Sequence, residues 1–159
     1  MIRQLKVLLR IKELKEEQAF RAVHVKRREV ANAAAAIEMA REKVRDNAAT
    51  LPAREDAIYR GIIGRVVNYD AIEDAKNEMV EIEREHAKLV DTVERATHVH
   101  ARIEKELAGV VEAHRKATRE RDKYDVLTEE VGSEFRAQAA LREESEIEDI
   151  FSTRRRRSA

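Results

Sequence analysis

The sequence predicts an all-α protein in which two long helices fold back on each other as an antiparallel coiled-coil hairpin. Apolar residues recur every seven positions through the first 60 residues, which keeps one apolar stripe on one side of a helix. A segment with two glycines interrupts this repeat, and a second stripe with steps of three and four begins after it. Because a helix cannot bury its own stripe, we expect the two helices to cover each other.

The first helix is predicted over residues 2–60. Its heptad series is apolar except at Glu16 and contains Ile2, Leu9, Val23, Val30, Ile37, Val44, Leu51 and Ile58. Pro52 opposes a helix here, because proline removes one backbone hydrogen bond and clashes with the preceding turn, at a cost of about 3 kcal/mol. We expect a kink or break over 49–51. The alternative is a bend that shapes the tip of the hairpin.

The chain should reverse direction over residues 61–68. Gly61 and Gly64 tolerate the positive φ angles of a tight turn, and Asn68 is a suitable N-cap for a second helix. If the chain folds back here, the numbers of facing residues should sum to about 130 along the coiled coil.

The second helix is predicted over residues 69–150, with a weak point where Gly132 and Ser133 adjoin. The residues beyond about 130 have no opposite number in the first helix and should project past it. The whole of 1–151 is expected to form a single coiled-coil domain. A basic disordered tail is expected over 152–159.

The composition suits a thin helical body and excludes several classes of protein. Charged residues make up 40% of the chain and aromatic residues only 4%, so few positions can belong to a thick core. The 32 basic and 32 acidic residues cancel, which argues against a nucleic-acid partner. The first ten residues are too short an apolar run for membrane insertion or a signal peptide, so we expect a cytoplasmic protein.

No pattern of catalytic or ligand-binding residues is present. Without cysteine the chain can form neither a disulfide nor a thiolate zinc site. His98 and His100 point about 200° apart on a helix, so they do not form a metal site. We therefore expect no enzyme activity, no cofactor and no bound metal.

Three histidines at intervals of fourteen residues share one heptad position on the predicted inner stripe. They are His86, His100 and His114. We interpret them as polar layers of the helix interface that fix its register, as buried polar residues do in coiled coils. The alternative is a pH sensor.

The arrangement as a whole resembles the FliJ/YscO family of stalk proteins of type III secretion, which serve flagella and injectisomes. The chain begins in a basic amphipathic helix, turns near its middle, and ends in a longer helix with an acidic and then a basic segment. The resemblance is clearest in the turn and helix restart at 61–72 and in the segment 125–149.

This resemblance implies a non-enzymatic central stalk at the inner-membrane secretion apparatus. Family members bind and stimulate a hexameric secretion ATPase, link it to an export-gate membrane protein, and bind export chaperones. We expect the same partners here, with no direct membrane insertion and a monomeric free state. The alternatives are a structural coiled-coil scaffold and a prefoldin-like holding chaperone, both unrelated to secretion.

Two candidate binding surfaces follow from the resemblance together with the residues. Residues 1–30 carry nine basic and four acidic side chains, a field that can steer this end toward an acidic pore. The candidate ATPase-binding residues are Arg3, Leu5, Lys6, Leu8, Leu9 and Arg10. Apolar residues also crowd the turn, where they either bind the export gate or pack on each other. The candidate gate-binding residues are Tyr59, Ile62, Ile63, Val66, Val67 and Tyr69.

Overall fold

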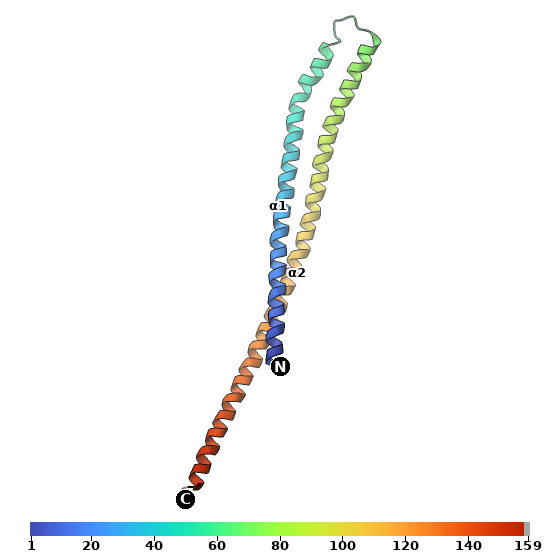
Figure 1. The fold of residues 1–159 in the computed structure, drawn as a ribbon. Helices are drawn as coiled ribbons and strands as arrows, with labels where there is room; N and C mark the ends of the chain where they lie inside the picture. The colour runs from blue at the N-terminus through green and yellow to red at the C-terminus, as the bar shows by residue number, and fades with distance from the viewer. Residues whose placement is uncertain (158–159) are drawn as a thin grey trace. The chain divides into compact units, whose positions relative to one another are not determined.

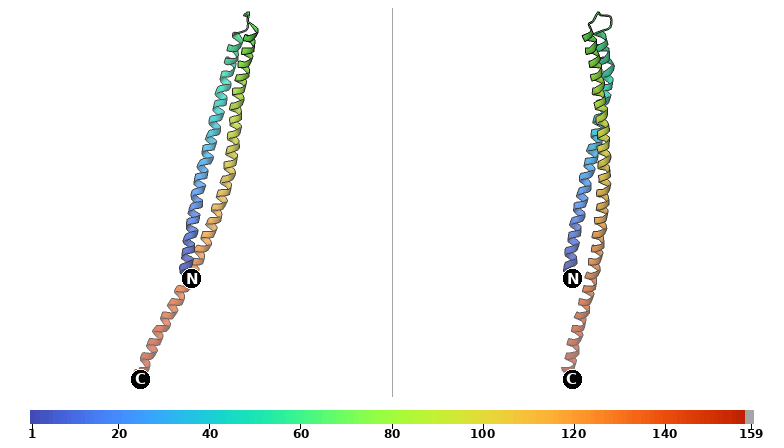
Figure 2. Two further views of the ribbon diagram at one scale, coloured as in Figure 1. Left: turned by 45° about the vertical axis from the view of Figure 1, so that its right-hand side comes forward. Right: turned by 90° about the vertical axis from the view of Figure 1, so that its right-hand side faces the viewer.

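The protein is described by a computed structural model over residues 1–157, which contains two helices. They are α1 (Ile2–Arg60) and α2 (Tyr69–Arg157), and no β-strand occurs in the part of the chain that the structure describes. The helices lie side by side and run in opposite directions (Figures 1 and 2), which confirms the predicted antiparallel hairpin.

The chain divides into two compact units. One consists of Met1–Val23 with Val110–Ala159, and we call it the terminal unit. The other is His24–Gly109, which we call the turn unit. A pair of helices has only local contacts and no central core shared along its length, so contacts group by position along the hairpin. The single domain expected over 1–151 stays a prediction.

The turn unit has a narrow apolar core between its two helical segments. Ala33, Ile37 and Ala40 are buried on α1 at steps of four and three, and Ile82 is buried on α2. These steps are the coiled-coil repeat, so the predicted stripe is the face that packs. Ion pairs border this seam, with Lys26 Nζ donating to Glu106 Oε2 at 3.0 Å and Arg54 to Glu85 at 2.9 Å.

The reversal of the chain lies at residues 61–68. Gly64 has a φ of 77°, the left-handed conformation that favours glycine. The amide of Ile63 donates to the carbonyl of Tyr59 at 2.8 Å, which tightens the end of α1. Asn68 caps α2, because its Oδ1 accepts a hydrogen bond from the amide of Ala71 at 3.0 Å.

The terminal unit pairs the first turns of α1 with the middle of α2. Val23 is buried, and Lys12 Nζ donates to Glu120 Oε2 at 3.0 Å across the two helices. The Ile2 side chain lies beside Gly132, where an added Cβ would be 3.6 Å from its Cδ1. Every described residue after Gly132 is exposed, and this segment, 133–157, continues α2 past the start of α1 (Figure 1). We call it the extension.

The helices are continuous at three places where the sequence predicts an irregularity. α1 is unbroken through Pro52, whose exposed position lets water reach the carbonyl group that proline leaves unbonded. α2 is equally unbroken at Gly132, which is buried against Ile2.

The third of these places is the predicted tail. Residues 152–157 are helical, whereas 158–159 lie outside the described residues. The hydroxyl groups of Ser152 and Thr153 donate to the carbonyl of Asp149, and the arginines of the last turn suit the negative end of the helix dipole.

The register of the hairpin is close to the expected one. Facing residue numbers sum to 130 for Glu16 with His114, to 132 for Lys12 with Glu120, and to 133 for Asn47 with His86. The predicted sum was about 130, and among the described residues only the pair of Arg54 with Glu85 near the turn, which sums to 139, departs from it by more than one helical turn.

Candidate functional site

The candidate ATPase-binding residues divide between two faces of α1. Leu5 and Leu9 are half-buried on the seam that faces α2 in the terminal unit, so they close the hairpin. Leu8 is 40% exposed and faces solvent. The three basic residues of the set are also exposed, and they are Arg3, Lys6 and Arg10. The structure therefore brings four of the six candidates to the surface.

Sequence reasoning missed a second apolar stripe on the outer face of α1. Val7, Ile11 and Leu14 are 60%, 42% and 43% exposed, although they are separated by the coiled-coil steps of four and three. Their spacing is the signal that could have found them, since an apolar stripe away from the seam has no partner in the hairpin. We call Val7, Leu8, Ile11 and Leu14 the outer stripe.

A cation anchors α1 to α2 beneath this face. Lys12 Nζ contacts Glu120 and also lies 5.1 Å from the centroid of the Tyr124 ring, within the range of a cation–π interaction. The hydrogen bond from Lys12 holds the pKa of the Glu120 carboxyl below its usual value. The helix that carries the outer stripe is thus held to α2 by the contacts of Lys12 on its other face.

The three spaced histidines lie on the helix interface, as predicted. His114 Nε2 is 3.0 Å from Glu16 Oε1, and its ring lies 5.7 Å from that of Phe20 in the terminal unit. His86 Nδ1 is 2.9 Å from Asn47 Oδ1 in the turn unit. His100 instead stands 3.6 Å from Glu104 of its own helix. Two of the three histidines therefore form polar layers that join α1 to α2.

The candidate gate-binding residues are mostly exposed. Ile63, Val66 and Tyr69 are 72%, 106% and 73% exposed, and Tyr59 is 48% exposed. Ile62 and Val67 are half-buried. The four exposed ones form an apolar surface that the hairpin itself does not use.

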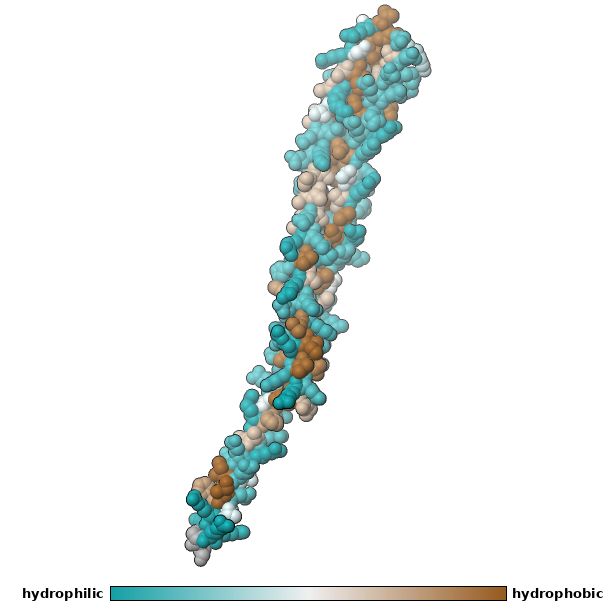
Figure 3. Space-filling view, viewed as in Figure 1, coloured by the Kyte–Doolittle hydropathy of each residue, from teal (hydrophilic) through white to brown (hydrophobic). Residues whose placement is uncertain are grey.

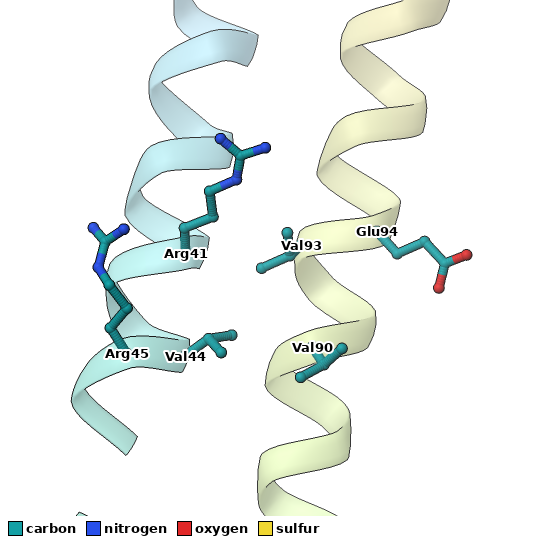
Figure 4. A pocket seen from close by; sticks show the side chains of 6 residues that line it. All are labelled: Arg41, Val44, Arg45, Val90, Val93 and Glu94. Atoms are coloured by element: carbon teal, nitrogen blue, oxygen red, sulfur yellow. The ribbon is translucent and has the colours of Figure 1, made fainter. Parts of the chain in front are cut away.

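A shallow apolar groove of about 370 Å³ lies between the helices of the turn unit (Figure 4). Val44 and Val93 face each other across it, and Val90 lies one turn away on α2. Arg41 and Arg45 stand on α1 beside the groove, whereas Glu94 points away from it. The groove can hold an apolar side chain but offers no polar group that would orient a small ligand.

The surface as a whole is polar with small apolar patches. Figure 3 shows hydrophilic residues over most of the visible face, interrupted by brown patches that include one near the C-terminal end. No group of three or more potential metal-binding side chains occurs within residues 1–157. None of the described helices has a stretch long and apolar enough to span a membrane.

Comparison with known proteins identifies the family. The family described as type III secretion protein YscO matches residues 5–153. The chain belongs to this family. A search among curated proteins finds no match.

A solved YscO-family structure has the same fold. The chain is similar to the crystal structure of type III secretion protein YscO from Vibrio parahaemolyticus, with a TM-score of 0.88 over 93% of each chain. The two sequences are 22% identical, so this likeness concerns the fold. The family match over residues 5–153 confirms the family that the sequence resembles, and the solved structure has the same fold.

Proposed function

We propose that this YscO-family protein is a non-enzymatic stalk that binds and stimulates the hexameric ATPase of a type III secretion apparatus. The observation that carries the proposal is the outer face of the terminal unit, where unpaired cations adjoin the outer stripe. Arg3 and Lys6 make no ion pair with any described residue, and Val7 beside them is 60% exposed. Such a face can be steered into an acidic pore by charge and then held by apolar contact.

The proposal places this protein at the cytoplasmic side of the inner-membrane secretion apparatus. The exposed turn residues Tyr59, Ile63, Val66 and Tyr69 would bind the export-gate protein, and export chaperones would be further partners. The exposure of the turn supports the first of these contacts, because an apolar cluster of this kind commonly marks a protein interface.

The direct test is ATP turnover by the cognate secretion ATPase with and without this protein. We expect stimulation by the wild type, stronger at low salt because exposed charges are screened by ions. The variant Arg3→Glu/Lys6→Glu/Arg10→Glu should lose most of the stimulation. A wild type that leaves turnover unchanged at every salt concentration would contradict the stalk function.

A matched pair of apolar variants separates contact from charge. Ile11→Ser removes an exposed residue of the outer stripe, and Met39→Ser removes one of similar character that is 61% exposed in the turn unit. Stimulation should fall for Ile11→Ser and stay at the wild-type level for Met39→Ser. Equal losses in both variants would mean that the outer stripe is not the contact.

The gate contact has its own test. Ile63→Asp and Val66→Asp place charges on the most exposed turn residues and should weaken binding to the purified gate protein. Helicity measured by far-ultraviolet circular dichroism should stay unchanged, because neither side chain is buried. Retained binding in both variants would exclude the turn as the gate contact.

A further inference from the structure

The extension of α2 exposes an acidic and apolar surface that has no partner in the described chain. Ile147, Ile150 and Phe151 are 53%, 63% and 65% exposed and lie at steps of three and one, on the same side of a helix. Five carboxylates lie before or between these apolar residues, and none makes an ion pair with a described residue. These carboxylates belong to Glu143, Glu144, Glu146, Glu148 and Asp149.

The first turns of α1 carry the opposite charge. Arg3, Lys6 and Arg10 are exposed beside the outer stripe, and only Arg10 has an ion-pair partner, Glu13. The same unit therefore holds two exposed apolar stripes, one among unpaired cations and one among unpaired carboxylates. Their charges and their apolar character are complementary.

These two surfaces cannot meet within one described chain. Ile2 lies beside Gly132, so α1 begins where the extension begins. The helix α2 continues without a break from there to Arg157. Pairing the extension with the outer face of the same α1 would require α2 to fold back on itself. A second copy can supply the missing helix.

One alignment matches both the charges and the apolar residues. Placing residue n of α1 beside residue n + 140 of another extension sets Val7 against Ile147 and Ile11 against Phe151. Arg3 then faces Glu143, and Lys6 faces Glu146. One block of opposite charges thus agrees with the apolar pairs at Val7 and Ile11, which resembles parallel coiled-coil pairing.

The same alignment is compatible with two-fold symmetry. In the terminal unit, the numbers of neighbouring residues on α1 and α2 sum to 130–134, as Ile2 lies beside Gly132. An extension that runs antiparallel to the α2 of its partner therefore runs parallel to the partner's α1. If a two-fold axis passes near Ala137, each copy places its extension on the outer stripe of the other. Both contacts then form at once, as in an isologous dimer.

We propose that the terminal unit associates with a second copy of this chain, each extension packing on the outer stripe of the other. This pairing would stabilise the extension, because a helix without a facing element depends on its intrinsic propensity alone. The monomer expected from the sequence is then the state at low concentration. The proposal does not rest on the proposed ATPase contact.

Sedimentation equilibrium over a wide protein concentration range tests the proposal. The mass should rise from the monomer value of 18.3 kDa toward twice that value, and high salt should oppose the rise. Arg3→Glu/Lys6→Glu and Glu143→Arg/Glu146→Lys should each raise the dissociation constant by about tenfold or more, since several exposed pairs become repulsive together. Combining the two pairs of changes restores opposite charges and should restore the dimer.

An apolar control uses two exposed residues of the extension. Ile147→Ser should weaken association, whereas Leu141→Ser should leave it unchanged, because six helical residues separate these side chains by about 120° around the axis. Circular dichroism at low concentration checks that every variant keeps its helicity. A wild type that stays monomeric throughout would overturn the proposal and leave this surface to a different protein.

Failure of the combined charge variant to associate would also overturn the proposal, provided that both partial variants are weakened. The combined variant separates self-association from the ATPase contact as well. It should dimerise like the wild type and yet fail to stimulate the ATPase, since its α1 has reversed charges. Wild-type stimulation by this variant would contradict the ATPase contact without affecting the dimer.

Discussion

Two glycines should affect stability in opposite directions when changed to alanine. Gly109 is inside α2 with no atom within 4 Å of an added Cβ, so Gly109→Ala should raise the free energy of unfolding by about 1 kcal/mol. Gly64 has a φ of 77°, and Gly64→Ala should lower it by about 1–2 kcal/mol. Urea denaturation measures both. Equal effects in the two variants would contradict this assignment of the turn.

Lys26 joins two carboxylates, one of them on the facing helix. Its Nζ donates to Glu29 at 2.6 Å and to Glu106 at 3.0 Å, and these bonds raise the pKa of Lys26. The hydrogen bond from Lys26 in turn lowers the pKa of Glu106. A carboxyl with a lowered pKa contributes stability above its ordinary value, about 4.3, and the contribution is lost as pH falls through the lowered value.

The variant Glu106→Gln should therefore melt at a slightly lower temperature than the wild type at neutral pH. The difference should shrink below about pH 4, as the wild-type carboxyl takes up a proton. It should also shrink above the raised pKa of Lys26, where the ammonium loses its charge. Glu83→Gln is a suitable control, because Glu83 is exposed and makes no ion pair in the described chain. A pH-independent difference for Glu106→Gln would exclude the pair as its cause.

Sequence periodicity predicts which residues face inward wherever the seam is regular. The predicted stripe of α1 contains Val23 and Ile37, and both are buried. It fails at the end of the seam, since Ile72 is 48% exposed next to the turn. Leu5 and Leu9 lie on the seam whereas Leu8 faces solvent, so these three neighbouring leucines do not share one face of α1. Residues that are adjacent in sequence do not all lie on one face of a helix. Residues that share a face are three or four positions apart.

At the scale of an element, polar layers fix how the helices align. The contact between His86 and Asn47 is satisfied only when the two helices adopt one register, whereas apolar layers tolerate a shift. The pairing of residue types could be read from neither helix alone. The sequence shows the histidines at regular intervals, but Asn47 becomes their counterpart only through the fold.

The double variant Asn47→Leu/His86→Leu should be more stable and less specific. Replacing both polar partners by apolar groups should raise the free energy of unfolding by about 1 kcal/mol. The chain has no cysteine, so Ala31→Cys and Ala101→Cys allow two spin labels to be attached at exposed positions of the facing helices. Their distance distribution should broaden in the double variant. An unchanged distribution would mean that other layers fix the register.

At the scale of the whole molecule, resistance to hydrogen exchange should vary strongly along the chain. The buried layers around Ile37 and Ile82 should exchange slowest, and the turn at 61–68 and the extension should exchange fastest, because they lack buried contacts. Mass spectrometry of peptic fragments measures this. Strong protection of the extension at low protein concentration would contradict its lack of a facing helix.

The same measurement links stability to association. If a second copy covers the extension, exchange of residues 143–151 should slow as the protein concentration rises, while the turn should be unaffected. Exchange that is independent of concentration, in a sample shown to be dimeric, would place the dimer contact elsewhere.

The position of Tyr124 beneath the ammonium group of Lys12 supplies an optical probe that the chain already contains. The protein has three tyrosines and no tryptophan, and Tyr59 and Tyr69 both belong to the turn unit. In a Tyr59→Phe/Tyr69→Phe variant, all tyrosine fluorescence would come from the terminal unit. Heating this variant while recording fluorescence and circular dichroism together would show whether the two units melt in one transition or in two. A label-free readout of one end of the hairpin is thus available without adding any foreign group.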